Sequence, residues 1–435
     1  MSTAASAPPA TAESATNRPG YTFPRSPASV TDLGTLFDRI TEAAELPRPQ
    51  AVSFPAGVYT NSEFLDWETG AIFRKEWISL AHISQFPKQG DYLRVDLCGE
   101  PLIVTKGKDD RLRVLSRVCR HRGMDLMPEG GSHAPQGNQR VILCPYHLWS
   151  YDLNGKMVGA PEMQEAEGFD RSEVCLHEFR SEIWEGFLFV NLDGKAAPLA
   201  ETYGRLRDEF LKGVKMEEAI LVWDQHWDCS FNWKILLENF MEAYHHLGAH
   251  RKTLEPFLPA KGCWTEAEDP GFSAMHLPLR PDLVETIRET GDAGTTMAPF
   301  PGLTTEQYLE WWVYLGFPNF LLFTAPDRVY WYRLIPTGPE TCSLTTTMLL
   351  HPDTIARDDY AEVYEKEVEA AINFHLEDME VCAATQKGMR SSAYQQGRLS
   401  HLEEPIWHFQ RYLARKIKES ALQLWKNESS FFAGR

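Results

Sequence analysis

Two cysteine and histidine pairs stand out in the N-terminal half of the sequence. Cys119 and His121 form a C-x-H pair, and Cys144 and His147 form a C-x-x-H pair. Each pair follows a short apolar run, which a sheet would use to hold two loops opposite each other. The two runs are residues 112–118 and 141–143. Four such ligands could bind a tetrahedral zinc ion, or a [2Fe-2S] cluster with two thiolates on one iron and two imidazoles on the other.

A second concentration of ligand-type residues lies at 238–250. The preceding apolar residues predict a helix over 233–246, and its end fills with carboxylates and imidazoles. Burying such groups is costly unless they bind something, so we infer a metal site. Helix geometry alone would pair His246 with His250, one turn apart on one face. The residues themselves leave the choice between His245 and His246 open.

These segments resemble motifs of the Rieske non-haem iron oxygenases. CRHRG at 119–123 and CPYHLWSYDLNG at 144–155 are similar to the two cluster-binding loops of that family. Zinc ribbons do not typically carry such aromatic and glycine residues behind the second pair. ENFMEAYHHLGAH at 238–250 resembles the motif E-N-x-x-E/D-x-Y-H-x(4)-H. The resemblance runs from about Val58 to Leu413, and the chain is similar to the large (alpha) oxygenase subunit of the aromatic-ring-hydroxylating dioxygenases.

The resemblance implies two ligand sets. The [2Fe-2S] cluster would be held by Cys119, His121, Cys144 and His147, and the catalytic Fe(2+) by His245, His250 and Asp378. Using His245 with His250 requires the helix to distort, for which Gly248 offers conformational freedom, and leaves His246 as an accessory residue. Asp378 matches the family's downstream segment E-D…Q-x-G. Without the resemblance, Asp378 would be interpreted as a solvated charge in an acidic helix.

Two further residues are candidates for catalysis. Glu242 precedes His245 by three residues and could orient that ligand. The resemblance implies another role, in which the acid at this position passes electrons from the cluster of a neighbouring subunit in a cyclic trimer. Asn239 matches the family's asparagine near the iron, although it could equally cap or kink the helix.

The expected fold is α+β, with a small all-β Rieske domain and a larger catalytic domain whose antiparallel sheet is flanked by helices. We predict a disordered tail at 1–30, an N-terminal helical segment at 31–76 packed on the catalytic domain, the Rieske [2Fe-2S] domain at 77–195, and the mononuclear iron domain at 196–435. Strands are predicted at 92–97, 101–105, 141–143, 186–192, 312–325, 329–336 and 342–351. Helices are predicted at 33–43 with Thr31 as the cap, 206–211, 233–246, 359–385 and 406–425.

Composition excludes several classes of protein. The formal charge of -18 disfavours binding to nucleic acid, which requires clustered lysine and arginine. No stretch reaches the roughly 20 apolar residues of a membrane helix. The start of the sequence lacks the features of a secretion signal, and eight cysteines in 435 residues are too few for a disulfide framework. We therefore expect a cytoplasmic protein without a membrane partner.

The resemblance implies the terminal oxygenase component of a multicomponent Rieske monooxygenase or dioxygenase. It would use O2 and electrons from an NAD(P)H-dependent reductase, sometimes through a ferredoxin, to hydroxylate or dealkylate a small organic substrate such as an aromatic compound. A homotrimer is expected, with or without a beta subunit. The sequence has no G-x-G-x-x-G loop, so the nicotinamide should bind to a separate reductase. Arg120 and Arg122 beside a cluster ligand could contact an acidic ferredoxin, or could simply be solvated.

The alternative substrate class is the quaternary ammonium compounds, such as choline, carnitine or betaines. A glutamate at position 242 resembles that branch of the family, in which an aromatic box could hold the trimethylammonium group. The tryptophans of the catalytic half are Trp223, Trp227, Trp233, Trp311, Trp312 and Trp331, for which core packing is the competing interpretation. Two rival classes also stay open. One is an electron-transfer or binding protein with a degenerate second site, and the other is a zinc-stabilised structural protein.

Overall fold

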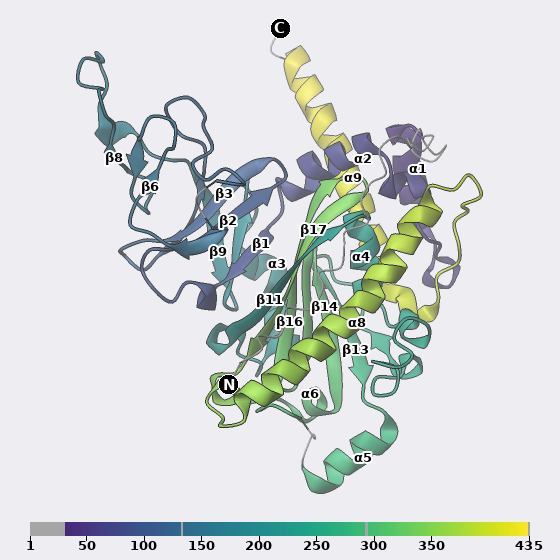
Figure 1. Ribbon diagram of the computed structural model, residues 1–435. Coiled ribbons are helices and arrows are strands. Elements are labelled where there is room, and N and C mark those ends of the chain that lie inside the picture. The colour runs from purple at the N-terminus through teal and green to yellow at the C-terminus, as the bar shows by residue number, and fades with distance from the viewer. Residues whose placement is uncertain (1–30, 132–133, 292–294, 434–435) are drawn as a thin grey trace, which may run out of the picture.

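The computed structural model describes residues 31–131, 134–291 and 295–433, so the tail predicted at 1–30 lies outside the described residues. Within these ranges the chain forms an N-terminal helical segment, a smaller β part and a larger part that mixes helix and sheet (Figure 1). The predicted α+β fold class is therefore confirmed. No described helix combines the length and the apolar character needed to cross a membrane.

The smaller part is built on an antiparallel sheet of the described strands in the order β1-β10-β9-β4-β3-β2-β5. Cys98 and Gly99 join β2 to β3 with φ of 50° and 81°, the left-handed conformation that a tight hairpin turn requires. A short sheet, β6-β7-β8, carries the second cysteine and histidine pair. The strands are β1 (Ile78–His82), β2 (Asp91–Leu97), β3 (Glu100–Lys106), β4 (Leu112–Ser116), β5 (Gln136–Asn138), β6 (Ile142–Leu143), β7 (Ser150–Tyr151), β8 (Met157–Gly159), β9 (Glu178–Trp184) and β10 (Phe187–Asn191).

The larger part contains a second antiparallel sheet in the order β11-β17-β16-β15-β14-β13-β12. The single strand predicted at 312–325 is wrong, because β14 and β15 form a hairpin there. Pro318 lacks a backbone donor and Asn319 donates to the Leu334 carbonyl at 2.6 Å, which favours a turn. The strands are β11 (Ile220–Cys229), β12 (Trp264–Thr265), β13 (Phe272–Pro278), β14 (Glu310–Gly316), β15 (Phe320–Ala325), β16 (Arg328–Gly338) and β17 (Thr341–Leu350).

Both faces of this second sheet are buried along its central strands, whereas the edge strand β11 has exposed residues such as His226. Tyr330 and Tyr332 of β16 point into the core under the helices, and Val329 and Trp331 point into a second core on the opposite face. On that opposite face the two sheets meet, where the Trp331 indole donates to Ser79 of β1 at 3.2 Å. Strands β6 and β8 lie at the far end of the smaller part, away from the helices of the larger part (Figure 1).

The long helix α8 (Tyr360–Met389) crosses the face of the second sheet (Figure 1). Its buried residues recur every three or four positions, so one stripe of the helix faces the protein. They are Ala371, His375, Asp378, Cys382, Gln386 and Met389. The short helix α4 (Trp233–Phe240) packs beside α8.

Helix α9 (Glu404–Ala433) packs against α1 (Leu33–Glu45), and α2 (Ser62–Glu68) belongs to the same N-terminal segment. Thr31 is not the cap of α1 as predicted. Asp32 is the cap, because its carboxylate accepts from the Thr35 backbone N–H at 2.9 Å. The remaining helices of the larger part are α3 (Leu199–Arg205), continued by a wider turn over Leu206–Leu211, α5 (Pro281–Thr290), α6 (Thr305–Leu309) and α7 (Pro352–Ile355).

The helix predicted over 233–246 is also wrong in its extent, because α4 ends at Phe240. Met241 and Ala243 leave the helical region, with ψ of 7° and 1°, before a short 3-10 turn over Tyr244–Leu247. The Glu242 carboxylate accepts from the backbone N–H groups of Tyr244 and His245, and so competes with the helical hydrogen bonds. The break therefore precedes Gly248, the residue for which conformational freedom was expected.

Candidate metal centres

The two cysteine and histidine pairs lie on neighbouring loops that are each closed by backbone hydrogen bonds to the cysteine. Gly123, at φ +73°, donates to the Cys119 carbonyl at 3.0 Å. Leu148, at φ +61°, donates to the Cys144 carbonyl at 3.1 Å. Each loop is therefore a tight turn that fixes its cysteine and projects its histidine outward.

The four candidate ligands separate into two inner thiols and two outer imidazoles. Cys119 and Cys144 are 2% and 1% exposed, whereas His121 is exposed and His147 half-buried. The two histidines meet through their Nδ1 atoms at 3.2 Å. One ring face of His121 stacks on Trp149 at 4.5 Å.

A single tetrahedral zinc would draw all four ligand atoms within about 4 Å of one another, given metal-ligand bonds of roughly 2.0–2.3 Å. Within the described ranges, only His245, His250 and Asp378 bring three or more ligand atoms within 4.8 Å of one another. The cysteine and histidine loops do not, so they do not suit one zinc ion. A pair of thiols behind a pair of imidazoles fits a two-iron cluster.

The thiol side of these loops is supported by Tyr151 from β7. Its hydroxyl lies 3.4 Å from Cys119 Sγ, and the Arg120 backbone N–H donates to the same hydroxyl at 3.1 Å. Burial raises the pKa of the Cys144 thiol, although the backbone N–H groups of Tyr146 and His147 oppose that shift. A bound metal would supply the positive charge that holds the thiolate form.

The second centre joins segments that are far apart in the sequence. His245 lies in the 3-10 turn after α4, His250 follows it, and Asp378 comes from α8. Asp378 Oδ1 is 2.9 Å from His250 Nε2 and 3.6 Å from His245 Nε2. The two Nε2 atoms and this carboxylate therefore converge on one point.

A second carboxylate holds the far side of each imidazole. Glu242 lies 2.6 Å from His245 Nδ1, and Glu377 lies 2.8 Å from His250 Nδ1. Thr253 donates to Glu377 at 2.6 Å and so fixes that carboxylate. Pairs of this kind set the ring orientation and the tautomer, leaving Nε2 free for a metal.

Charges within this centre shift the pKa of Asp378 and the pKa values of the two histidines in opposite directions. Burial opposes ionisation of Asp378, but the hydrogen bond and charge of His250 hold the pKa of Asp378 below its usual value. Burial likewise opposes protonation of the two histidines. Glu242 nevertheless raises the pKa of His245, and Asp378 raises the pKa of His250. Without a metal the imidazoles are therefore stabilised as cations, and a metal ion would replace those protons.

His246 lies outside this ligand set, although helix geometry had favoured it. Its Nδ1 lies 3.2 Å from the Leu258 carbonyl, and burial lowers its pKa to about 3. Because the helix has already ended, His246 and His250 no longer share a helical face. The structure thus brings His245, and not His246, to His250 and Asp378.

Among the other predicted site residues, Glu242 is buried against His245, whereas Asn239 is half-buried and its side chain has no hydrogen-bond partner among the described residues. Sequence reasoning gave no role to Glu377 or Thr253. Glu377 is the glutamate of the E-D…Q-x-G segment, and a glutamate in an acidic helix suggests solvation. Its only signal was its position beside Asp378.

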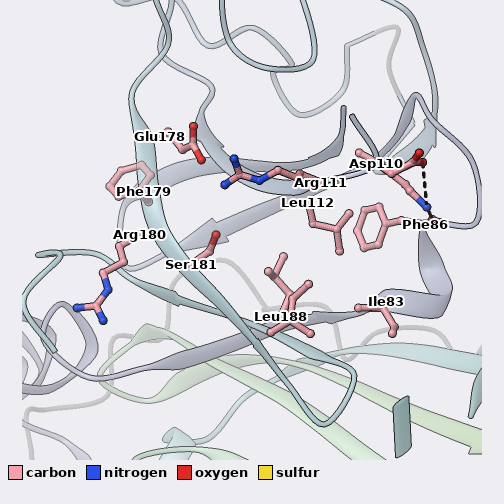
Figure 2. A pocket seen from close by; sticks show the side chains of 12 residues that line it. Ile83, Phe86, Asp110, Arg111, Leu112, Glu178, Phe179, Arg180, Ser181 and Leu188 are labelled. Atoms are coloured by element: carbon pink, nitrogen blue, oxygen red, sulfur yellow. Dashed lines mark hydrogen bonds and ion pairs between the residues drawn. The ribbon is translucent and has the colours of Figure 1, made fainter. Parts of the chain in front are cut away.

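The groove drawn in Figure 2 does not mark either centre. It has a volume of about 730 Å³, lies between β4, β9 and β10, and is lined by residues such as Leu112, Phe179 and Leu188. Leu112 begins β4, whereas Cys119 follows the other end of that strand. The groove therefore lies away from the cysteine and histidine loops.

Comparison with known families agrees with this geometry. Residues 216–419 match the ring hydroxylating alpha subunit (catalytic domain), and residues 76–178 match the Rieske [2Fe-2S] domain. The chain therefore belongs to the Rieske non-haem iron oxygenases, as a protein of the oxygenase alpha-subunit type. Membership implies a [2Fe-2S] cluster and Fe(2+) as cofactors, and both ligand sets fit them.

Several individual proteins are similar to this chain. The carnitine monooxygenase oxygenase subunit of Acinetobacter baumannii is 32% identical over 206 residues, covering 46% of this chain and 53% of that protein. The match thus spans about half the length of this relative. The glycine betaine monooxygenase oxygenase subunit of Chromohalobacter salexigens is 26% identical over 376 residues, covering 81% and 82%.

Solved structures show the same fold. A quaternary ammonium Rieske monooxygenase, CntA, aligns with a TM-score of 0.71 and 24% identity, covering 87% of this chain and 98% of that one. Naphthalene 1,2-dioxygenase from Rhodococcus sp. aligns with a TM-score of 0.70 and 20% identity, covering 88% and 98%. At these identities the likeness concerns the fold alone.

Proposed function

We propose that this chain is the terminal oxygenase component of a multicomponent Rieske oxygenase. It would accept electrons that start from NAD(P)H on a separate reductase and use O2 to hydroxylate or dealkylate a small organic substrate. The proposal rests on one observation. The same chain contains a pair of loops with two cysteines and two histidines, and a site of two histidines and one carboxylate. A zinc-stabilised structural protein or a simple electron carrier would need only the first.

In this proposal His245, His250 and Asp378 would hold the iron, as two imidazoles and one carboxylate suited to a mononuclear iron that reacts with O2. The iron, when bound, supplies the dioxygen chemistry, and the cluster supplies electrons one at a time. The residues around them do the positioning. Glu242 and Glu377 keep both imidazoles turned with Nε2 inward, and the burial of His250 and Asp378 limits the access of bulk water to the site.

We further propose that electrons reach the iron from the cluster of a neighbouring copy in a homotrimer, with Glu242 as the bridging residue. Two exposed apolar surfaces support this arrangement. One surrounds the cluster loops and includes Tyr146 and Leu148, 52% and 55% exposed. The other lies beside Glu242 and includes Tyr244 and Leu247, 48% and 50% exposed. Whether a beta subunit joins the trimer is to be tested by purification of the native assembly.

For electron delivery we propose docking of a reductase or ferredoxin at the cluster loops, in the cytoplasm where NAD(P)H is supplied. Arg120 and Arg122 are exposed there. Arg122 is fixed over Tyr146, with its guanidinium 5.2 Å from the ring centroid and a 3.1 Å hydrogen bond to the hydroxyl. A preorganised cation beside an exposed ligand suits an acidic partner.

For the substrate, we propose the quaternary ammonium class in preference to the aromatic class first expected. The carnitine and glycine betaine monooxygenase subunits among the relatives support this choice, as does glutamate at position 242. The six tryptophans do not support it as one aromatic box. Trp233 and Trp331 are buried in cores on opposite faces of the sheet, and Trp312 packs on His276 at 4.0 Å.

The test is oxygen uptake and product formation by the purified, iron-loaded protein with a reconstituted reductase. The panel contains carnitine, choline, glycine betaine and aromatic acids. Substrate-dependent uptake with an N-methylated compound supports the proposal. Turnover of aromatic compounds alone would contradict the proposal of a quaternary ammonium substrate. Absence of acid-labile sulfide from a fully loaded preparation would contradict the proposal that the chain is a Rieske oxygenase.

A further inference from the structure

His375 is a buried histidine on α8 without a hydrogen-bond partner in the part of the chain that the structure describes. Its side chain is 1% exposed, and neither Nδ1 nor Nε2 meets a donor or acceptor among the described residues. Buried polar groups are nearly always paired, and an exception points to a water, an ion or a ligand. Some group outside the described residues should therefore meet this ring.

Comparison with the other buried histidines shows that this is unusual within the described residues. His246 meets the Leu258 carbonyl at 3.2 Å, and His408 meets the Ser273 hydroxyl at 3.0 Å. His276 has carboxylates on both ring nitrogens, Glu310 at 2.9 Å and Glu266 at 3.2 Å. His82 and His351 also have partners. The fold thus satisfies buried imidazoles elsewhere but leaves this one unpaired beside the second metal centre.

The position of His375 relates it to that centre. It precedes Asp378 by three residues, so both side chains lie on the buried stripe of α8 about one turn apart. The charges of Asp378 and His250 act on it in opposite directions, and burial lowers its pKa to about 4. The ring is therefore neutral at physiological pH and presents one N–H donor and one nitrogen acceptor.

Aromatic rings from the sheet confine the imidazole. Trp227 of β11 lies 4.8 Å away and Tyr332 of β16 lies 5.5 Å away, measured between ring centroids. The Trp227 indole cannot serve as the missing partner, because it donates to Thr346 at 3.0 Å. Tyr332 also packs on Phe240, the last residue of α4, at 4.9 Å. The polar ring thus lies in an apolar setting between α8, the sheet and the helix that leads to His245.

We propose that His375 hydrogen-bonds a hydroxyl-type oxygen held beside Asp378, as a positioning residue for the reaction. A neutral imidazole can both donate to and accept from such an oxygen, which either a substrate hydroxyl or an ordered water supplies. The inference rests on the proposed function for the identity of the substrate. The unpaired ring itself is independent of that function.

The experiment compares wild type with His375→Phe, which keeps a ring but removes both nitrogens, and with His375→Gln, which restores a donor and an acceptor. His408→Phe is the matched control, a buried histidine on α9 whose partner is Ser273. Iron and sulfide contents are measured first and should equal those of wild type. Dissociation constants for choline and carnitine, which carry a hydroxyl, and for glycine betaine, which does not, are then measured by anaerobic calorimetry on the oxidised holoenzyme.

If the oxygen belongs to the substrate, His375→Phe should weaken choline or carnitine about tenfold, leave glycine betaine unchanged, and be rescued in part by His375→Gln. If it belongs to a water, all ligands should be affected equally, and peroxide released per product should rise severalfold. A crystal structure of the resting holoenzyme should then show that water within about 3.2 Å of a ring nitrogen.

The proposal is overturned if His375→Phe matches wild type in binding and in peroxide release, and if neither resting nor ligand-soaked crystals hold an oxygen at that distance. That result differs from failure of the proposed function. In the latter case wild type itself binds and oxidises nothing in the panel, and the crystal of the resting protein still decides whether an oxygen meets His375.

Discussion

The two metal centres of this chain are built in contrasting ways. The cluster loops hold four candidate ligands within 119–147, closed by local turns, and their imidazoles face outward at the end of the smaller part. The candidate iron site joins His250 to Asp378 across 128 positions, buries both, and places a carboxylate behind each imidazole. A site that receives electrons from a partner must be reachable, whereas a site for oxygen chemistry must exclude water and fix its ligands.

The largest expected effect tests whether the centres are separable. Asp378→Asn should lose the mononuclear iron and lower turnover by more than about a hundredfold, beyond the range for supporting residues. The cluster should remain, so iron should fall from about three to about two atoms per chain at constant sulfide. Metal analysis and the visible spectrum measure this. Retained turnover in the variant would contradict the ligand assignment.

A smaller effect tests the carboxylates behind the imidazoles. Glu377→Gln should weaken Fe(2+) binding about 10- to 100-fold, because the amide no longer favours the correct tautomer and orientation of His250. Glu380→Gln is the matched control, an exposed glutamate on the same helix. Titration with Fe(2+) under anaerobic conditions gives both affinities. Equal Fe(2+) affinities of the two variants would show that Glu377 acts only as a surface charge.

The pH dependence of iron binding sharpens the same contrast. The pKa values of His245 and His250 are raised in the metal-free protein, so these rings are protonated up to a higher pH than usual. As the pH falls through those raised values, protons compete with iron. The affinity should then drop about tenfold per unit for one proton and up to about a hundredfold for two. A flat affinity between pH 8 and pH 6 would contradict the raised pKa values.

At the cluster, a single hydrogen bond should tune the reduction potential. A hydrogen bond from the Tyr151 hydroxyl to Cys119 Sγ would stabilise the more negative, reduced form of a bound cluster, so Tyr151→Phe should lower the potential. A hydrogen bond of about 1 kcal/mol corresponds to roughly 40 mV for one electron. Spectroelectrochemistry measures the shift. Tyr92→Phe, which removes a hydroxyl bonded to the Ala134 carbonyl instead, should leave the potential unchanged.

The smallest effect concerns the exposed charges of the cluster loops. Arg122→Gln should slow cluster reduction by the partner severalfold at low ionic strength, and the difference should vanish at high salt because screening removes the attraction. Stopped-flow absorbance follows the reduction. If the wild-type rate does not depend on salt, Arg122 is a solvated charge that only packs on Tyr146.

Local chemistry in the sequence determined much of this protein. The spacing of apolar residues and the turn residues act over a few positions. They predict the α+β class, the short strands before each cysteine and the long amphipathic helices. The four cluster-loop residues were predicted as one set because their spacing is itself local. The errors were local too, since Asp32 replaces Thr31 as the cap of α1 and Pro318 with Asn319 divides a predicted strand into a hairpin.

Tertiary structure decided the iron site. Periodicity favoured His246, but Glu242 ends the helix and turns His245 toward Asp378. Resemblance supplied Asp378, whereas Glu377 had no signal beyond its place beside Asp378, and the unpaired ring of His375 had none. Their roles depend on which side chains α8 brings against α4 and the sheet. Such contacts join residues more than a hundred positions apart, and no spacing along the chain encodes them.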